Sequence, residues 1–161
     1  MFHFNKESRL GRGVLLAAVI AGAAAFAAPA IAGECPADQK KPNAREAVDL
    51  EAVGKTDTVI ASIDLSKAIN LDGRLLRMRK VTVEPGGVVP WHPHAERPAI
   101  LYIIEGQIHE YASDCAAPIV HKAGDVVPES GDVSHWWKNL DDETVVLLSA
   151  DLPTDPNDKN M

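Results

Sequence analysis

The stretch Pro85–His94, Pro-Gly-Gly-Val-Val-Pro-Trp-His-Pro-His, decides how the rest of the chain is interpreted. Its two histidines, His92 and His94, are two residues apart and precede the apolar run Ala99–Ile104. Side chains at i and i+2 point to the same face of a β-strand, so an extended His-x-His directs two imidazoles to one point, as a metal site requires. Pro93 favours the extended conformation, because a proline disfavours the helical region for the residue before it. Two surface histidines on a loop are the alternative at this stage.

The first 32 residues have the three parts of a secretory signal peptide. They begin with basic residues, continue as an alanine-rich apolar run, and end in the small-residue tripeptide Ala30-Ile31-Ala32. The apolar run is short for a membrane span, and Gly22 and Pro29 interrupt it. We therefore expect an exported protein, periplasmic or secreted, that is cleaved after Ala32 and has no stable membrane insertion afterwards.

The mature chain would be acidic and would form one domain. The full chain of 161 residues has a formal net charge of −7, and the leader contains more basic than acidic residues. Without a basic patch the mature chain is not expected to bind nucleic acid. Residues 33–161 are enough for one domain with a core and too few for two.

Two cysteines, Cys35 and Cys115, are present. In an oxidising, exported compartment such a pair is more often a disulfide than two free thiols. Neither cysteine has Cys-x-x-Cys spacing, so a redox-active pair or a zinc knuckle is not expected. We predict a disulfide between Cys35 and Cys115 that ties the start of the mature chain to the domain.

Short β-rich segments recur along the rest of the chain, separated by turn signals such as Glu129–Asp132. Such spacing, with no convincing long helix, indicates an all-β sandwich or barrel. A short barrel or roll has an interior able to hold one small ligand. The chain divides into a signal peptide (1–32), a polar N-terminal arm (33–56), a β-barrel domain (57–151) and a flexible C-terminal tail (152–161).

A third histidine, His135, completes a resemblance to a known family. The sequence resembles the cupin superfamily, in particular its small, single-domain, type-2-like members. The first cupin motif, Gly-x5-His-x-His followed by a Glu and a Gly, is matched by Gly86, His92, His94 and Gly106. The second motif is matched by Gly124, His135 and Asn139, with Pro128 and Gly131 displaced. The resemblance implies a single cupin-type β-barrel, also called a double-stranded β-helix or jelly roll.

One position departs from the cupin pattern. The Glu of the first motif should fall at position 98 or 99, where this sequence has Pro98 and Ala99. The resemblance therefore implies three metal ligands, His92, His94 and His135, and leaves the fourth ligand open. Without the carboxylate a divalent ion would keep more positive charge and favour an anionic or chelating ligand. The expected cofactor is a divalent transition metal, and Fe, Mn, Ni, Cu and Zn are not resolved.

Further side chains are candidates for the pocket around the metal: Glu96, Trp137, Tyr102 and Arg77. Glu96 could act as a weak fourth ligand or as a base. Trp137 is two residues from His135 and should share its face of the strand. Tyr102 is three residues from Ala99, so it should point outward if Ala99 points inward.

Other aromatic and histidine residues are assigned structural roles. Trp91 and Trp136 should point away from their histidine neighbours and pack. His109 is interpreted as an exposed hairpin residue and His121 as a strand-end residue, and neither is expected to be a ligand.

The resemblance implies an exported protein that binds one divalent transition metal and a small-molecule ligand. Dioxygenase-like chemistry on a small acidic or enolic molecule is the most natural activity, although a fold does not define a function. No residue outside the metal shell stands out as an acid or base, so a non-catalytic small-ligand or metal-binding cupin is the alternative. A cupin without metal is a third hypothesis. A homodimer could form through the sheets, with Thr144–Leu148 as interface or as core.

Overall fold

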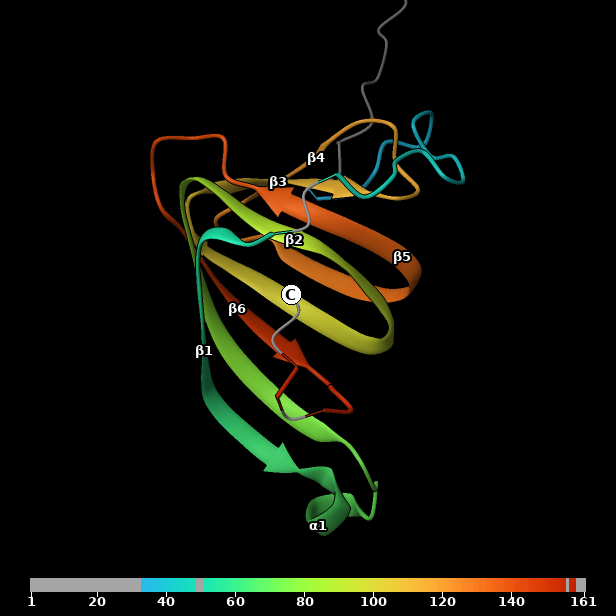
Figure 1. Cartoon of the computed structure of the whole chain (residues 1–161), viewed down its shortest axis with the longest axis vertical. Helices are drawn as coiled ribbons and strands as arrows, with labels where there is room; N and C mark the ends of the chain where they lie inside the picture. The colour runs from blue at the N-terminus through green and yellow to red at the C-terminus, as the bar shows by residue number, and fades with distance from the viewer. Residues whose placement is uncertain (1–32, 49–50, 156, 159–161) are drawn as a thin grey trace, which may run out of the picture.

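The computed structural model describes residues 33–48, 51–155 and 157–158 (Figure 1). The predicted signal peptide lies outside these residues. Their elements, in chain order, are β1 (Val53–Asp64), α1 (Leu65–Ile69), β2 (Leu75–Glu105), β3 (Gln107–Ala112), β4 (Ile119–Lys122), β5 (Val126–Lys138) and β6 (Val145–Asp151). No helix in this part of the chain is long and apolar enough to cross a membrane. The predicted β fold is confirmed, and β1 begins inside the segment expected to be the polar arm.

The strands pair antiparallel in the order β1-β2-β5-β3-β4, and β6 pairs with β2. The 31-residue β2 bends along its length, so that both its first part, from Arg77 to Val83, and its last part, from Ala99 to Glu105, pair with β6. This return of β2 curves the sheet around an interior, as the crossing ribbons of Figure 1 show. The sequence suggests several separate strands here, whereas the structure joins them into one.

The interior is apolar at one end and polar at the other. Along β6, Val145, Leu147, Ser149 and Asp151 are buried and alternate with more exposed residues, so this strand contributes to the core, one of the two roles that the sequence left open. The apolar core also contains Trp137 and residues of β2 and β3, among them Val81, Val83, Leu101, Ile103 and Ile108. The change from Leu147 to Ser149 marks the start of the polar end, where the candidate site lies.

Asp151 organises part of this polar end. Its Oδ2 lies 2.8 Å from Arg77 Nη2, 3.1 Å from Arg97 Nη1 and 3.2 Å from Arg79 Nη2. Buried charges are tolerated when they are paired in this way. Arg97 Nε also lies 3.3 Å from Asp158 Oδ2, so the described end of the predicted flexible tail contacts the barrel.

The N-terminal arm is fastened to the loop between β3 and β4. Cys35 and Cys115 form the predicted disulfide. Arg45 donates hydrogen bonds to the carbonyl oxygens of Cys115, at 3.0 Å, and Ala116, at 2.7 Å. Backbone hydrogen bonds between residues 39–44 and residues 113–116 add to these contacts. The arm therefore forms part of the folded domain.

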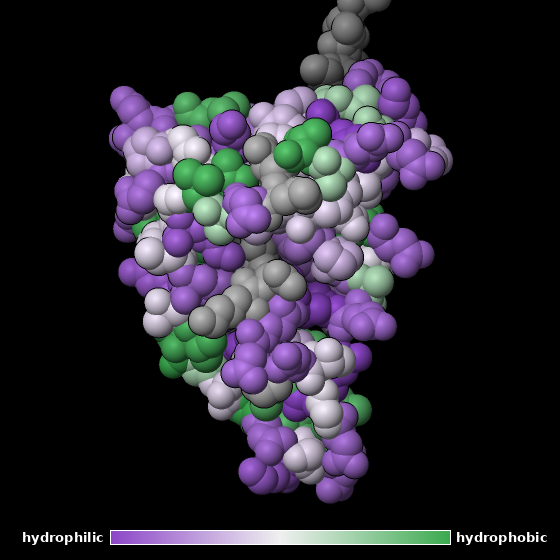
Figure 2. Space-filling model, in the orientation of Figure 1, coloured by the Kyte–Doolittle hydropathy of each residue, from purple (hydrophilic) through white to green (hydrophobic). Residues whose placement is uncertain are grey.

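The outer face of the barrel carries exposed hydrophobic residues. Ile100, Tyr102 and Ile104 of β2 and Val126 of β5 are among them. Figure 2 shows one side of the molecule, which is largely hydrophilic with separate hydrophobic patches. A homodimer through the sheets stays a prediction.

Asn139, the last residue of the second cupin motif, has a structural role. Its buried Nδ2 donates to the carbonyl oxygens of Val83, at 3.0 Å, and Glu143, at 2.7 Å, while its Oδ1 accepts from the Asp141 backbone N–H at 3.0 Å. Only an amide side chain supplies two donors and an acceptor in this geometry. Asn139 thus joins the β5–β6 loop to β2.

We expect Asn139→Ala to lower the free energy of unfolding by about 1–3 kcal/mol, because the buried carbonyl group of Val83 and the partly buried hydrogen bond to Glu143 lose their donor. Urea denaturation at neutral pH measures this loss, and Asn157→Ala, at an exposed position, is the control. Equal stability of the two variants would contradict this role.

Candidate metal centre

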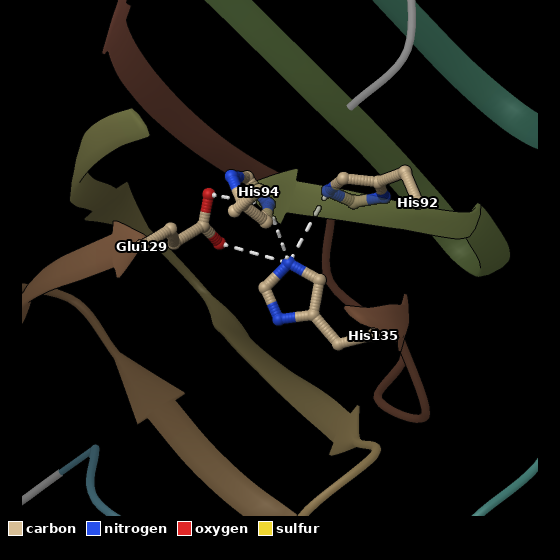
Figure 3. A group of neighbouring side chains, drawn as sticks. All are labelled: His92, His94, Glu129 and His135. Atoms are coloured by element: carbon tan, nitrogen blue, oxygen red, sulfur yellow. Dashed lines mark hydrogen bonds and ion pairs between the residues drawn. The ribbon is translucent and has the colours of Figure 1, made fainter. Parts of the chain in front are cut away.

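Four side chains converge inside the barrel: His92 and His94 from β2, and Glu129 and His135 from β5 (Figure 3). All four are buried. His135 Nε2 lies 2.9 Å from His94 Nε2 and 3.2 Å from His92 Nε2. The Glu129 oxygens lie 3.2 Å from His94 Nε2 and 3.3 Å from His135 Nε2. The structure therefore brings the three predicted ligands together and adds a carboxylate.

The spacing of these atoms fits one metal ion. Two ligand atoms that are each about 2.1 Å from an ion and subtend 90–110° are about 3.0–3.4 Å apart. The four ligand atoms lie within 4.8 Å of one another, and the contacts above fall close to that range. Three imidazoles and a carboxylate are a donor set that transition metals accept.

Hydrogen bonds at the far side of each ring orient the three histidines. Nδ1 of His92 bonds to the carbonyl oxygen of Pro90 at 2.7 Å, and Nδ1 of His94 bonds to that of Arg97 at 3.1 Å. Nδ1 of His135 bonds to Glu110 Oε1 at 2.5 Å. Because carbonyl and carboxylate oxygens only accept, each Nδ1 carries a hydrogen, and each neutral ring presents its Nε2 lone pair to the centre.

The protonation states suit a cation at the centre. Burial lowers the pKa of His92 well below its usual value and that of His94 to about 4, so both rings are neutral at physiological pH. Burial raises the pKa of Glu129 to about 7. Although burial opposes it, the carboxylates of Glu129 and Glu110 raise the pKa of His135. Without a cation the cluster therefore retains a proton, which a metal ion would displace.

Glu129 is the functional candidate that the sequence analysis missed. The prediction of a turn at residues 129–132 is wrong, because β5 continues through them. Burial alternates from Val126 to Ser130, which places Glu129 on the inward face with Val127. Glu129 pairs directly with Ala99, the position where the cupin pattern has its Glu. Glu129 thus supplies the carboxylate from the strand opposite the expected position. The sequence signal that could have indicated this is the i+2 spacing from the apolar Val127, which puts both side chains on the same face.

Three of the predicted pocket residues lie outside the cluster. Glu96 is exposed, and its backbone oxygen accepts from Arg74. Tyr102 is 46% exposed on the outer face, and Arg77 belongs to the buried ion pairs around Asp151. None of the three contributes to the four-residue group.

Trp137, Glu110 and His121 support His135. Trp137 is buried with its ring edge-on to His135 at 5.7 Å and stacked on His121 at 4.7 Å. His121 is wholly buried, and its Nε2 lies 2.7 Å from Glu110 Oε2. Although burial raises the pKa of Glu110, the hydrogen bonds from His121 and His135 lower it to about 2. His121 is therefore part of the interior, and no local sequence signal indicated its partnership with Glu110.

The other residues that the sequence analysis gave structural roles are at least partly buried. His109, expected to be exposed, is half-buried, and Trp91 is half-buried as well. Trp136 stacks on Tyr111 with ring centroids 4.0 Å apart.

A cavity of about 280 Å³ adjoins the cluster. His94, Glu129 and His135 line it together with apolar residues such as Ile119, Val127 and Val133. Residues of the N-terminal arm complete the lining, namely Gly33, Glu34, Cys35 and Lys40. The cavity can hold a small molecule next to the ligand atoms.

Comparison with known proteins agrees with this arrangement. Residues 79–151 match the family model described as Cupin domain, so this part of the chain is a cupin domain of the cupin superfamily. No curated protein sequence matches the chain.

Several solved structures share the fold. A protein from Thermotoga maritima titled a predicted oxalate decarboxylase is 19% identical over 74% of this chain and 97% of its own, with a TM-score of 0.52. A double-stranded β-helix protein from Klebsiella pneumoniae is 16% identical over 63% and 74%, with a TM-score of 0.51. The Cnp3 cupin domain of Schizosaccharomyces pombe is 16% identical over 65% and 67%, with a TM-score of 0.50. At these identities the likeness shows the fold alone.

We expect Glu129→Gln to raise the stability of the metal-free protein and to lower the stabilisation that bound metal provides. The ordinary pKa of Glu129 is 4.5 and its folded-state pKa is about 7, so the charged carboxylate destabilises the metal-free fold as pH rises through this window. At pH 8, Glu129→Gln should stabilise the metal-free protein by about 1–3 kcal/mol. The same variant should lose most of the stabilisation that added metal gives.

Thermal melting at pH 4.5 and pH 8, with and without metal, measures both effects, and Glu96→Gln at an exposed position is the control. A Glu129→Gln protein that is less stable without metal at pH 8 would contradict the assignment.

The pairing of Ala99 with Glu129 allows an exchange experiment. Glu129→Ala should lower the metal affinity more than about tenfold. Removing a residue that only hydrogen-bonds to a metal ligand already lowers affinity by about tenfold or more, and loss of a ligand should have a larger effect. Adding Ala99→Glu in that background should restore much of the affinity, because the carboxylate returns from the opposite strand. Competition titration with a chromophoric chelator measures the affinities, and equal affinity of the single and double variants would contradict the geometry.

Proposed function

We propose that this protein is an exported cupin that binds one divalent transition metal on His92, His94, Glu129 and His135. One observation carries the proposal: four buried atoms with lone pairs converge, and the Nδ1 hydrogen bonds of the histidines fix their Nε2 atoms toward the centre. Both Glu129 oxygens are buried without a hydrogen-bond partner. Such an arrangement is repulsive unless a cation or a proton lies between the groups.

The cavity beside the proposed ligands has room for a small molecule, which could bind the metal through one of its oxygen atoms. When bound, a metal of this kind supplies Lewis acidity or, for iron, oxygen activation. Glu129 cancels one positive charge of a divalent ion, which weakens the preference for a strongly anionic ligand expected for three histidines alone. Glu34 and Asp114 oppose Lys40 in the cavity lining. The carboxylates in the lining disfavour a strongly anionic ligand, so we propose a weakly acidic or enolic molecule and dioxygenase-like chemistry on it.

A non-catalytic binding protein is the second candidate. Among the ionisable residues lining the inner cavity, His94, Glu129 and His135 are the proposed ligands, and Glu110 is engaged by two histidines. The other ionisable residues of the lining, Glu34, Lys40 and Asp114, belong to the N-terminal arm and the β3–β4 loop and not to the strands that hold the proposed ligands. This observation favours ligand capture without turnover.

Export and removal of residues 1–32 also belong to the proposal. The leader-like sequence supports export, and the Cys35–Cys115 disulfide suits an oxidising compartment.

The metal content of the natively exported protein tests the proposal. Purified without chelator or affinity histidines, it should contain about one equivalent of one transition metal by mass spectrometry, because the site has one centre. His92→Ala/His94→Ala should lose this metal. Little metal in the wild type, with no uptake of added Fe, Mn, Ni, Cu or Zn, would contradict the proposal.

Activity assays then separate the two candidates. A dioxygenase should consume oxygen with a weakly acidic or enolic substrate, and His135→Ala should abolish consumption while the fold persists. A binding protein should show saturable thermal stabilisation by the ligand and no turnover.

A further inference from the structure

A buried chain of hydrogen bonds runs outward from His135 and ends at an unpaired nitrogen. Glu110 bridges His135 Nδ1, at 2.5 Å, and His121 Nε2, at 2.7 Å. Because the carboxylate accepts both bonds, a neutral His121 carries its hydrogen on Nε2 and presents a lone pair at Nδ1. That Nδ1 is buried and has no hydrogen-bond partner. A buried acceptor without a donor is costly, so the environment of this atom is informative.

Gly33 lies directly against this nitrogen. A Cβ atom on Gly33 would be 2.8 Å from His121 Nδ1 and 3.2 Å from its Cε1, and Gly33 has a φ of +88°. A side chain would therefore collide with the imidazole and strain the backbone. Only glycine brings the main chain this close to Nδ1.

The neighbouring residues hold Gly33 in place. Cys35 is joined to Cys115, which is wholly buried and packs with Ala112 and Ile119. Gly33 and Cys35 both line the cavity beside the candidate metal centre. The predicted cleavage point, between Ala32 and Gly33, therefore falls at the wall of this cavity.

We propose that cleavage after Ala32 creates a terminal ammonium group on Gly33 that donates a hydrogen bond to His121 Nδ1 and completes the chain from Gly33 through His121 and Glu110 to His135. The amine nitrogen is one bond from the Gly33 Cα, and an ammonium offers three hydrogens in place of the single, fixed N–H of a peptide. The carboxylates of Glu34, Glu110 and Asp114 outnumber the ammonium of Lys40 in the cavity lining and favour the positive charge of the new terminus. Gly33 and His121 are thus positioning residues, which fix the ring of His135 through Glu110.

This inference rests on the proposed export and not on metal binding. The first step is to export the full chain with its own leader and to determine the start of the mature protein by intact mass and N-terminal sequencing. A start at Gly33 is expected, and a start elsewhere overturns the proposal.

The second step compares two oxidised, metal-free chains, one beginning at Gly33 and one at Ala32. The extra residue converts the amine of Gly33 into an amide. The chain beginning at Gly33 should melt several degrees higher. Its α-amine should react with an acylating reagent about tenfold more slowly than that of the chain beginning at Ala32, because a charge-assisted hydrogen bond protects it. Equal melting temperatures or equal acylation rates overturn the proposal.

His121→Phe provides the matched control, because it keeps an aromatic ring on Trp137 and removes the acceptor. In this background the two chains should melt at the same temperature, and a difference that persists overturns the proposal. The acylation rates of the unsubstituted chains decide the question even if His121→Phe does not fold. Since the first step determines only the start of the mature chain and the later steps use metal-free protein, failure of metal binding and failure of this inference are separately observable.

Discussion

The antiparallel pairing of β2 with β5 is the constraint on which the site depends. This register sets His92 opposite His135 and Ala99 opposite Glu129. Irregularities between these pairs let the bent strands bring His94 beside them. Because side chains alternate across a strand, a one-residue shift in this register would turn the ligands out of the barrel. β2 also curves the sheet, because both of its ends pair with β6, so fold and site depend on the same strand.

The polar interior is tolerated because nearly every charged group has a partner of opposite sign or a hydrogen bond. Three arginines surround Asp151 at one side, and Glu110 is held by two histidines at the other. Burial of such groups without partners would cost several kcal/mol each. The Glu129 carboxylate stands apart, since its neighbours are the lone pairs of His94 and His135. Such an unfavourable environment for one buried carboxylate is expected where a cation is to be bound.

Sequence reasoning found the parts of this structure that depend on local pattern. The spacing of His92 and His94, the recurring strands and the cupin motifs predicted the fold and three members of the cluster. The presence of two cysteines in a chain expected to be exported to an oxidising compartment predicted the disulfide. Glu129 was missed because Ser130, Gly131 and Asp132 have turn-forming composition, whereas the pairing with β2 keeps them in a strand. The contacts of Glu110 and His121 depend on tertiary packing, for which a single sequence has no pattern.

An X-ray absorption spectrum of the metal-loaded protein would show directly whether the three histidines and Glu129 bind one metal ion. We expect one metal ion with three imidazole nitrogens and one carboxylate oxygen at about 2.0–2.2 Å, and an altered first coordination shell in Glu129→Ala. A spectrum without imidazole scattering, or one that Glu129→Ala leaves unchanged, would contradict a metal site made of these four residues.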